Sequence, residues 1–159
     1  LEEGARFKTE FELIKGRAGI IAFDYEACCK MKSVLEMVAR ISASGEDRID
    51  IRETASLDGD YARAILKTSI AVRDNAVAQV FNSISANGAH SRGHVDCKEI
   101  VQGKAIARAT PLVEVNNPTA HVTHEAAIGS VDSKQLETLM SRGLTEDEAV
   151  ELIIQGLLS

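Results

Sequence analysis

Apolar and polar residues alternate in short stretches along most of the chain. The alternation is clearest in residues 49–52, 61–65, 76–80 and 113–116. A period of two residues predicts β-strands with one buried face. Turn-forming residues separate these stretches at positions 57–60, 73–75, 86–88 and 116–118. Strands that recur at such short intervals predict an all-β architecture.

The composition of these stretches favours a β-helix, in which short strands stack as rungs. Aromatic residues make up only 4% of the chain, and many strand positions hold Ala or Ser. Small side chains suit closely stacked rungs better than the thick core of a sandwich, although the rhythm alone is also compatible with a sandwich. Residues 25–41 are ambiguous, because Cys28, Met31, Leu35 and Val38 have helical spacing. We interpret them as strands, in keeping with their surroundings.

Near the C-terminus the pattern changes to the period of an α-helix. Asp132 is placed to cap a first helix, which ends before Gly143. Thr145 and Glu148 have the spacing of a capping box for a second helix, and Gly156 is expected after its end. The apolar faces of the two helices hold Leu136, Leu139, Met140, Ala149, Leu152 and Ile153. The pattern predicts a helical hairpin whose apolar surface covers either the β-part or a partner protein.

We therefore predict a mainly β protein, with β-helix-like stacked strands followed by a small helical hairpin. Residues 1–128 form the β-core and residues 129–159 the helical region. The sequence begins at Leu1 rather than Met, so we expect the β-core to be cut at its N-terminal side.

Charge, hydropathy and cysteine content argue against several classes of protein. The formal net charge is −6 and no basic stripe is present, which argues against nucleic acid as a partner. The apolar runs are far shorter than the roughly 20 residues of a membrane span. The three cysteines cannot form a fully paired disulfide framework, and the N-terminus does not resemble a signal peptide. We expect a cytoplasmic protein in a reducing compartment.

The sequence lacks the motifs of a self-contained enzyme, since it has no nucleophile elbow, phosphate-cradling loop or CxxC pair. Cys97 shares a strand face with Val95, so it is read from spacing alone as a small buried residue. In the segment 121–125, strand parity puts His124 on one face, and His121 and Glu125 on the other. A core histidine and a solvated glutamate are the simplest interpretation of that segment.

The other cysteines and histidines give weaker signals. Cys28 and Cys29 are adjacent, so on a strand their side chains point to opposite faces and are not expected to chelate one metal ion. His90 and His94 flank a turn and are interpreted as hydrogen-bonded loop residues.

Three segments taken in order resemble one known family. They are residues 107–115, residues 120–129 with the run His-Glu-Ala-Ala-Ile-Gly, and residues 139–149 with the run Ser-Arg-Gly-Leu-Thr-Glu-Asp-Glu-Ala. Together they resemble the C-terminal signature of the SufB/SufD family of iron-sulfur cluster assembly scaffolds. The resemblance continues to Gly156, extends weakly back through Gly93 to Cys97, and covers chiefly the last 70 or so residues.

The resemblance implies a β-helix core whose C-terminal helices dock a Suf ATPase subunit, SufC. It also implies that a transient iron-sulfur cluster is assembled where two scaffold subunits meet. Cys97 and Glu125 match positions implicated in cluster assembly and metal binding in the SufB branch, and His124, next to Glu125 in the sequence, is expected to assist them. Leu139, Arg142 and Leu152 are the expected contacts to the ATPase.

Ligand chemistry agrees with a shared site. Iron-sulfur clusters are usually held by thiolates, and imidazole or carboxylate ligands can replace some of them. Three cysteines without a CxxC pair do not supply four thiolates, so we expect a second scaffold subunit, in a homodimer or a heterodimer. The main alternative is a structural SufD-like subunit without cluster ligands. A metal-dependent hydrolase built on His121, His124 and Glu125 is the alternative from another class.

Overall fold

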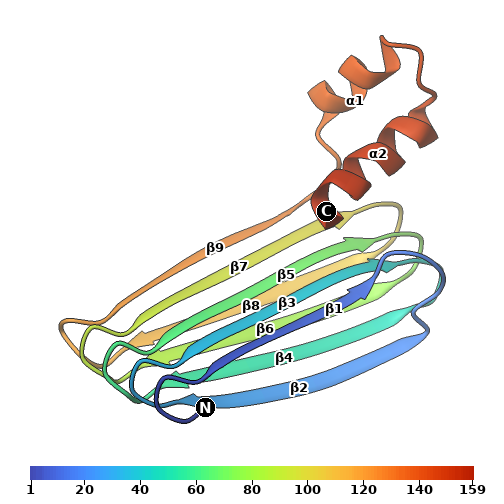
Figure 1. Cartoon of the computed structure of the whole chain (residues 1–159). Coiled ribbons are helices and arrows are strands. Elements are labelled where there is room, and N and C mark those ends of the chain that lie inside the picture. Colours follow the sequence, from blue (N-terminus) through green and yellow to red (C-terminus); the bar gives the residue numbers. More distant parts are fainter.

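The computed structural model describes the whole chain, residues 1–159, as nine strands followed by two helices (Figure 1). The strands are β1 (Arg6–Leu13), β2 (Ile20–Cys29), β3 (Val34–Ala43), β4 (Arg48–Leu57), β5 (Arg63–Val72), β6 (Val77–Ala86), β7 (Arg92–Val101), β8 (Ile106–Val115) and β9 (His121–Gly129). The helices are α1 (Ser133–Met140) and α2 (Glu146–Leu158). None of the helices is long and apolar enough to cross a membrane.

The strands form a parallel β-solenoid of about four turns. Odd-numbered strands make a five-stranded sheet in the order β1-β3-β5-β7-β9, and even-numbered strands make a four-stranded sheet in the order β2-β4-β6-β8. The chain passes from one sheet to the other at every turn, so each strand pairs with the strand two elements further along (Figure 1). The predicted β-helix-like fold is confirmed.

The core lies between the two sheets and is aliphatic. In the five-stranded sheet, one inward column runs through Met37, Leu66 and Val95, all buried and stacked in register. Residues between these positions face outward, which is the alternation seen in the sequence. Residues 25–41 supply the end of β2 and most of β3, so interpreting them as strands is confirmed.

The turns stack as regularly as the strands. Asn87 donates a hydrogen bond of 2.8 Å to Asp58, and Asn116 donates one of 2.9 Å to Asn87; in each pair the two residues are 29 apart. A Cβ at Gly88 would lie 2.1 Å from the carbonyl oxygen of Gly59 in the turn below. A glycine is therefore required where one turn rests directly on another. Tyr61, which was predicted to begin a strand, instead lies in such a turn with a φ of 60°, and β5 starts at Arg63.

The helical hairpin follows directly after β9, which ends at Gly129. Asp132 accepts a hydrogen bond from the backbone N–H of Gln135, and Thr145 and Glu148 form the predicted capping box. Helix α2 continues through Leu158, so Gly156 lies inside it and the expected end at that residue was wrong.

Only α2 is fastened to the solenoid. Its Ile154 and Leu158 pack on Ala71 of β5, and Glu151 pairs with Arg73 at 2.9 Å. Helix α1 has no buried residue and extends away from the sheets (Figure 1).

Candidate functional site

Cys97 lies in the interior of the solenoid, on β7. Its side chain is fully buried and shares the inward face with Val95, as strand parity predicted. Its register neighbours are Thr68 on β5 and Ala126 on β9. The Sγ–H donates a hydrogen bond to Asn82 Oδ1 across the core, at 3.7 Å. Cys97 therefore belongs to a polar group inside an otherwise aliphatic core.

The centre of that group is Glu53 of β4, whose residue surface is 1% exposed. Asn82 Nδ2 donates to Glu53 Oε2 at 2.7 Å, and the Thr68 hydroxyl donates to the same oxygen at 3.5 Å. Burial raises the pKa of Glu53 to about 7, and these hydrogen bonds oppose the rise. Glu53 was missed at the sequence level, although it has the same parity as the core residues Ile49 and Ile51 of its strand.

Burial also controls the chemistry of the thiol. It raises the pKa of Cys97 to about 12, and the negative charges of Glu99, Glu53 and Asp96 act in the same direction. Because the thiolate is the form that binds metals and attacks electrophiles, a cation placed beside Cys97 would favour its reactive form.

The interior holds a second buried carboxyl group, that of Glu99. It lies on β7, two residues after Cys97. Its residue surface is 2% exposed, and neither carboxylate oxygen has a hydrogen-bond partner. Burial raises the pKa of Glu99 to about 7, and the nearby charge of Asp96 adds to the rise.

Glu125 lies on the other face of the same sheet. It is on β9, where its register neighbour is Asp96, and its Oε1 is 3.3 Å from Lys98 Nζ on the outer surface. One chain therefore does not bring the carboxylate of Glu125 and the thiol of Cys97 together. Their joint role in cluster assembly stays a prediction.

His124 has the inward parity of Cys97 but is exposed, because β9 is the last strand of its sheet. His121 is exposed as well, so the interpretation of a core histidine in this segment was wrong. The outer backbone edge of β9 is unpaired (Figure 1), and its inward positions beyond Val122 are exposed. The end of the solenoid nearest Cys97 is thus an open edge, with His124 and Ile128 exposed along it.

A complete metal site is absent from the single chain. No group of three or more His, Cys, Asp or Glu side chains could hold a metal ion. His121, His124 and Glu125 therefore do not form the site that the hydrolase alternative requires.

The remaining candidates have local roles. Cys28 is exposed and Cys29 is buried at the end of β2, so the expected opposite orientation is confirmed. His90 lies in a turn and stacks on Tyr61 with ring centroids 5.0 Å apart. The expectation that His94 is a loop residue was wrong, because it lies on β7, where its Nδ1 is 2.8 Å from the Thr123 hydroxyl on the outer face.

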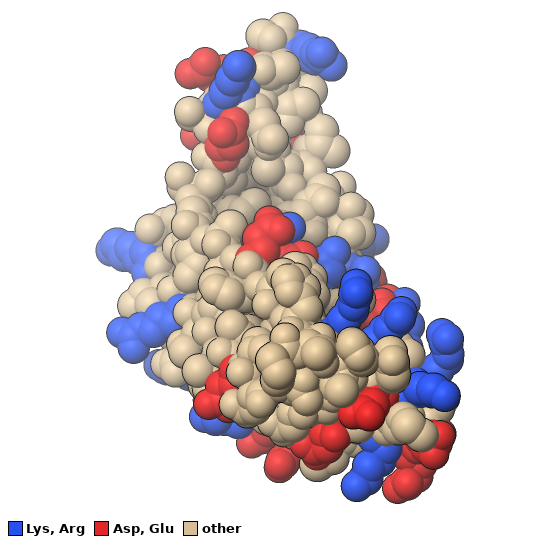
Figure 2. Space-filling view, turned by 90° about the vertical axis from the view of Figure 1, so that its left-hand side faces the viewer, with Lys and Arg blue, Asp and Glu red and all other residues tan.

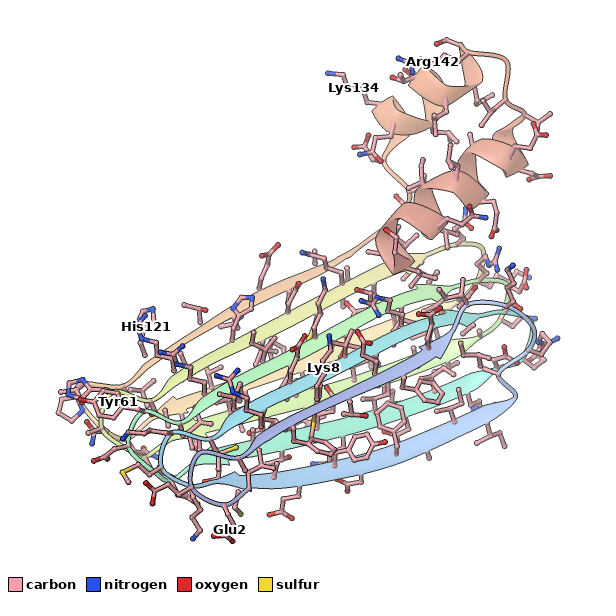
Figure 3. All side chains as sticks on the ribbon, in the orientation of Figure 1. Glu2, Lys8, Tyr61, His121, Lys134 and Arg142 are labelled. Atoms are coloured by element: carbon pink, nitrogen blue, oxygen red, sulfur yellow. The ribbon has the colours of Figure 1, made fainter.

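The residues predicted to contact an ATPase lie on the hairpin. Leu152 is 47% exposed and does not belong to the cluster that packs α2 on the sheet. Arg142 lies at the part of the hairpin farthest from the sheets and points away from them (Figure 3). Leu139 is half-buried on α1. In the view of Figure 2, Lys and Arg side chains gather along the right-hand side of the solenoid, with Asp and Glu side chains among and below them.

Comparison with known proteins agrees with this architecture. The family described as "SUF system FeS cluster assembly, SufBD core domain" matches residues 29–157. The chain is 41% identical to an iron-sulfur cluster assembly SufBD family protein of Methanocaldococcus jannaschii, covering 99% of this chain and 50% of that protein. It is 42% identical to a SufBD family protein of Pyrococcus horikoshii, covering 99% of this chain and 48% of that protein.

A more distant match is the iron-sulfur cluster assembly protein SufB of Bacillus subtilis, 35% identical over 69 residues, which are 43% of this chain and 15% of that protein. The chain spans about half the length of the first two relatives. With its parallel solenoid, its C-terminal helical hairpin and a family match over most of its length, the chain belongs to the SufBD family of iron-sulfur cluster assembly proteins.

Proposed function

We propose that this chain is a scaffold subunit of a Suf-type system, which holds a nascent iron-sulfur cluster where its open edge meets a second scaffold subunit. The observation that carries the proposal is the place of Cys97, one strand inside an unpaired edge. In this role the chain binds and positions cargo and is not a self-contained enzyme.

The incomplete ligand set supports a shared site. A cluster is usually held by four ligands, and one chain offers a single thiol near this edge, with His124 and Glu125 as an exposed imidazole and carboxylate. A second subunit that paired with β9 would satisfy the free backbone edge and add ligands. His124 on the inner side and Glu125 on the outer side would then flank the junction.

Anaerobic reconstitution with iron and sulfide tests the role of Cys97. The chain is reconstituted alone and with a second scaffold subunit, and cluster absorbance and bound iron per chain are measured. Cys97→Ala should abolish the cluster while the fold is kept, because removing one thiol leaves only a small cavity. Cys28→Ala is the matched control and should assemble as much cluster as the parent, since Cys28 is exposed on another turn.

The structural, SufD-like alternative predicts the opposite result. If Cys97→Ala assembles as much cluster as the parent, this chain holds its partners without ligating the cluster. Solution mass provides a second check, because a strictly monomeric chain at high concentration contradicts pairing through β9.

The helical hairpin is proposed to dock the ATPase subunit. Helix α1 has no buried residue, and Leu152 of α2 is exposed on the hairpin. Leu152→Asp and Arg142→Glu should both weaken co-purification with the ATPase. Because neither side chain packs on the sheets, both variants should keep the melting temperature of the parent, and unchanged co-purification would exclude this surface.

A further inference from the structure

Glu99 occupies a position that is held by an aliphatic residue on each of the other strands of its sheet. The column in register with it contains Leu13, Ile41, Ile70 and Ile128. Each is the type of side chain that fills the interior of a solenoid. A carboxyl group at this position is therefore not explained by packing.

The carboxyl group of Glu99 is also not explained by hydrogen bonding. Both oxygens are buried and unpartnered, whereas the other interior carboxyl group, Glu53, is held by Asn82 and Thr68. Buried polar atoms are nearly always paired, and burying a carboxylate without a partner is costly. Such a group indicates a ligand that would complete it.

Glu99 and Cys97 are placed to share that ligand. They are two residues apart on β7 and both face inward, which puts their Cα atoms about 7 Å apart. A soft sulfur beside a hard carboxylate oxygen suits a borderline cation such as Fe²⁺.

Glu125 is a poorer oxygen donor to this thiol within one chain. It lies on the opposite face of the sheet and is already paired with Lys98 at 3.3 Å. Glu99 has neither obstacle, and only Ala126 and Ile128 of β9 separate the pair from the open edge.

We propose that Glu99 is the oxygen ligand that captures incoming Fe²⁺ beside Cys97, before sulfide and a second subunit complete the cluster. The inference rests on the proposed scaffold function and adds a residue to that site. On capture the S–H bond of Cys97 breaks, an S–Fe bond forms and the proton leaves to solvent. Iron stays in the ferrous state, so no oxidant or reductant is needed.

Metal binding by the chain alone tests the inference before any cluster forms. Under anaerobic conditions the metal-free chain is titrated with Co²⁺, whose bond to a thiolate gives a charge-transfer absorption band, and iron retained per chain is measured with Fe²⁺. The parent should bind one ion with this band. Glu99→Gln and Glu99→Ile should lower the affinity at least about tenfold, the loss typical of a disturbed metal site.

Two controls separate ligation from folding. Glu36→Gln changes an outer-face carboxylate of β3 that is paired with Lys8 at 3.4 Å, so it should bind Co²⁺ as the parent does. Both Glu99 variants should melt at or above the temperature of the metal-free parent, since they remove an unpartnered buried carboxyl group. Glu99→Ile restores the residue type of the column, so it decides the question if Glu99→Gln folds poorly.

The outcomes distinguish this inference from the proposed function. If Cys97→Ala loses both ion binding and cluster while the Glu99 variants keep the parent's affinity, only the role of Glu99 is overturned. If Cys97→Ala still assembles a cluster, the scaffold function itself fails. A parent chain that binds no Co²⁺ overturns capture by this pair.

Discussion

Cys97 and Glu125 lie on neighbouring strands of one sheet and face opposite sides of it. The thiol is inside the solenoid, hydrogen-bonded to Asn82, and the carboxylate is outside, paired with Lys98. Strand parity fixes this arrangement, because a shift of one residue in β9 would turn every side chain of that strand over. A cluster bound by both groups would have to reach around the free edge of β9, which is where we propose that a second subunit binds.

The three thiols should differ sharply in reactivity. Cys28 is exposed, whereas Cys29 and Cys97 are fully buried and burial raises both of their pKa values. An alkylating reagent at pH 8 should modify one cysteine per folded chain and three per unfolded chain. Intact mass gives the count and peptide mapping gives the site. Rapid modification of Cys97 in the folded, metal-free chain would contradict the closed interior.

The buried Glu53 should make stability depend on pH. Burial raises its pKa from 4.5 to about 7, so between these values the folded chain binds the proton more tightly than the unfolded chain does. The free energy of unfolding should therefore fall as the pH rises, by about 3 kcal/mol across this window for one such group. The groups that face Glu53 are Thr68, Asn82 and, through Asn82, Cys97.

Glu53→Gln is the variant that tests this dependence, because the amide oxygen can still accept from Asn82. Urea unfolding at pH 5 and pH 7.5 should show a smaller loss of stability in the variant than in the parent. Asp47 provides an internal contrast. Burial pushes its pKa up, but hydrogen bonds from Arg17 and backbone N–H groups prevail and lower it to about 2. The contribution of Asp47 to the free energy of unfolding is lost only as the pH falls below about 4. An equal pH slope in parent and Glu53→Gln would show that Glu53 does not cause the effect.

The sequence predicted those features that depend on local pattern. Period-two stretches, turn residues and the two helix caps gave the β-helix and the hairpin, because each is decided by neighbours within a few residues. The 29-residue spacing of Asp58, Asn87 and Asn116 was also present, but the stacking it produces is visible only once the turns lie on one another.

The buried carboxyl groups could not be predicted in the same way. Glu53 and Glu99 have inward parity, yet a charged residue on a strand normally faces solvent, and that expectation outweighs parity. The face of α2 that packs on the sheet could not be predicted from the sequence either. Leu152 shares the helical period of the apolar residues, but the sheet is contacted by Ile154 and Leu158, a choice made by tertiary packing.

The turn glycine Gly88 should be intolerant of any side chain. A Cβ there would meet the carbonyl of Gly59 at 2.1 Å, and backbone atoms cannot move aside without displacing the turn below. Gly88→Ala should lower the free energy of unfolding by about 1–3 kcal/mol. Gly156→Ala is the matched control, because nothing lies within 4 Å of a Cβ at that helical position. That change should be neutral or stabilising by up to about 1 kcal/mol. If Gly156→Ala lowered the free energy of unfolding as much as Gly88→Ala does, the explanation by close turn stacking would be contradicted.

The attachment of the hairpin should depend on α2 alone. Ile154 is buried against Ala71 on the outer face of β5, and Glu151 holds Arg73 at 2.9 Å at the same junction. Ile154→Ala should weaken the attachment of α2 to the sheet by about 2–5 kcal/mol of free energy, which is the range for removing a large buried aliphatic side chain. The exposed ion pair should contribute only about 0–1 kcal/mol, so Glu151→Gln should have a small effect.

Hydrogen exchange measured by mass spectrometry resolves the two parts of the chain. In Ile154→Ala the amides of α2 should exchange faster, while those of β3 to β7 stay protected, because the solenoid core does not include this contact. Leu152→Ala is the control and should leave exchange in α2 unchanged, since Leu152 is largely exposed. If Ile154→Ala instead speeds exchange throughout the solenoid, the hairpin is part of the folding unit of the β-core and is not a separately attached element.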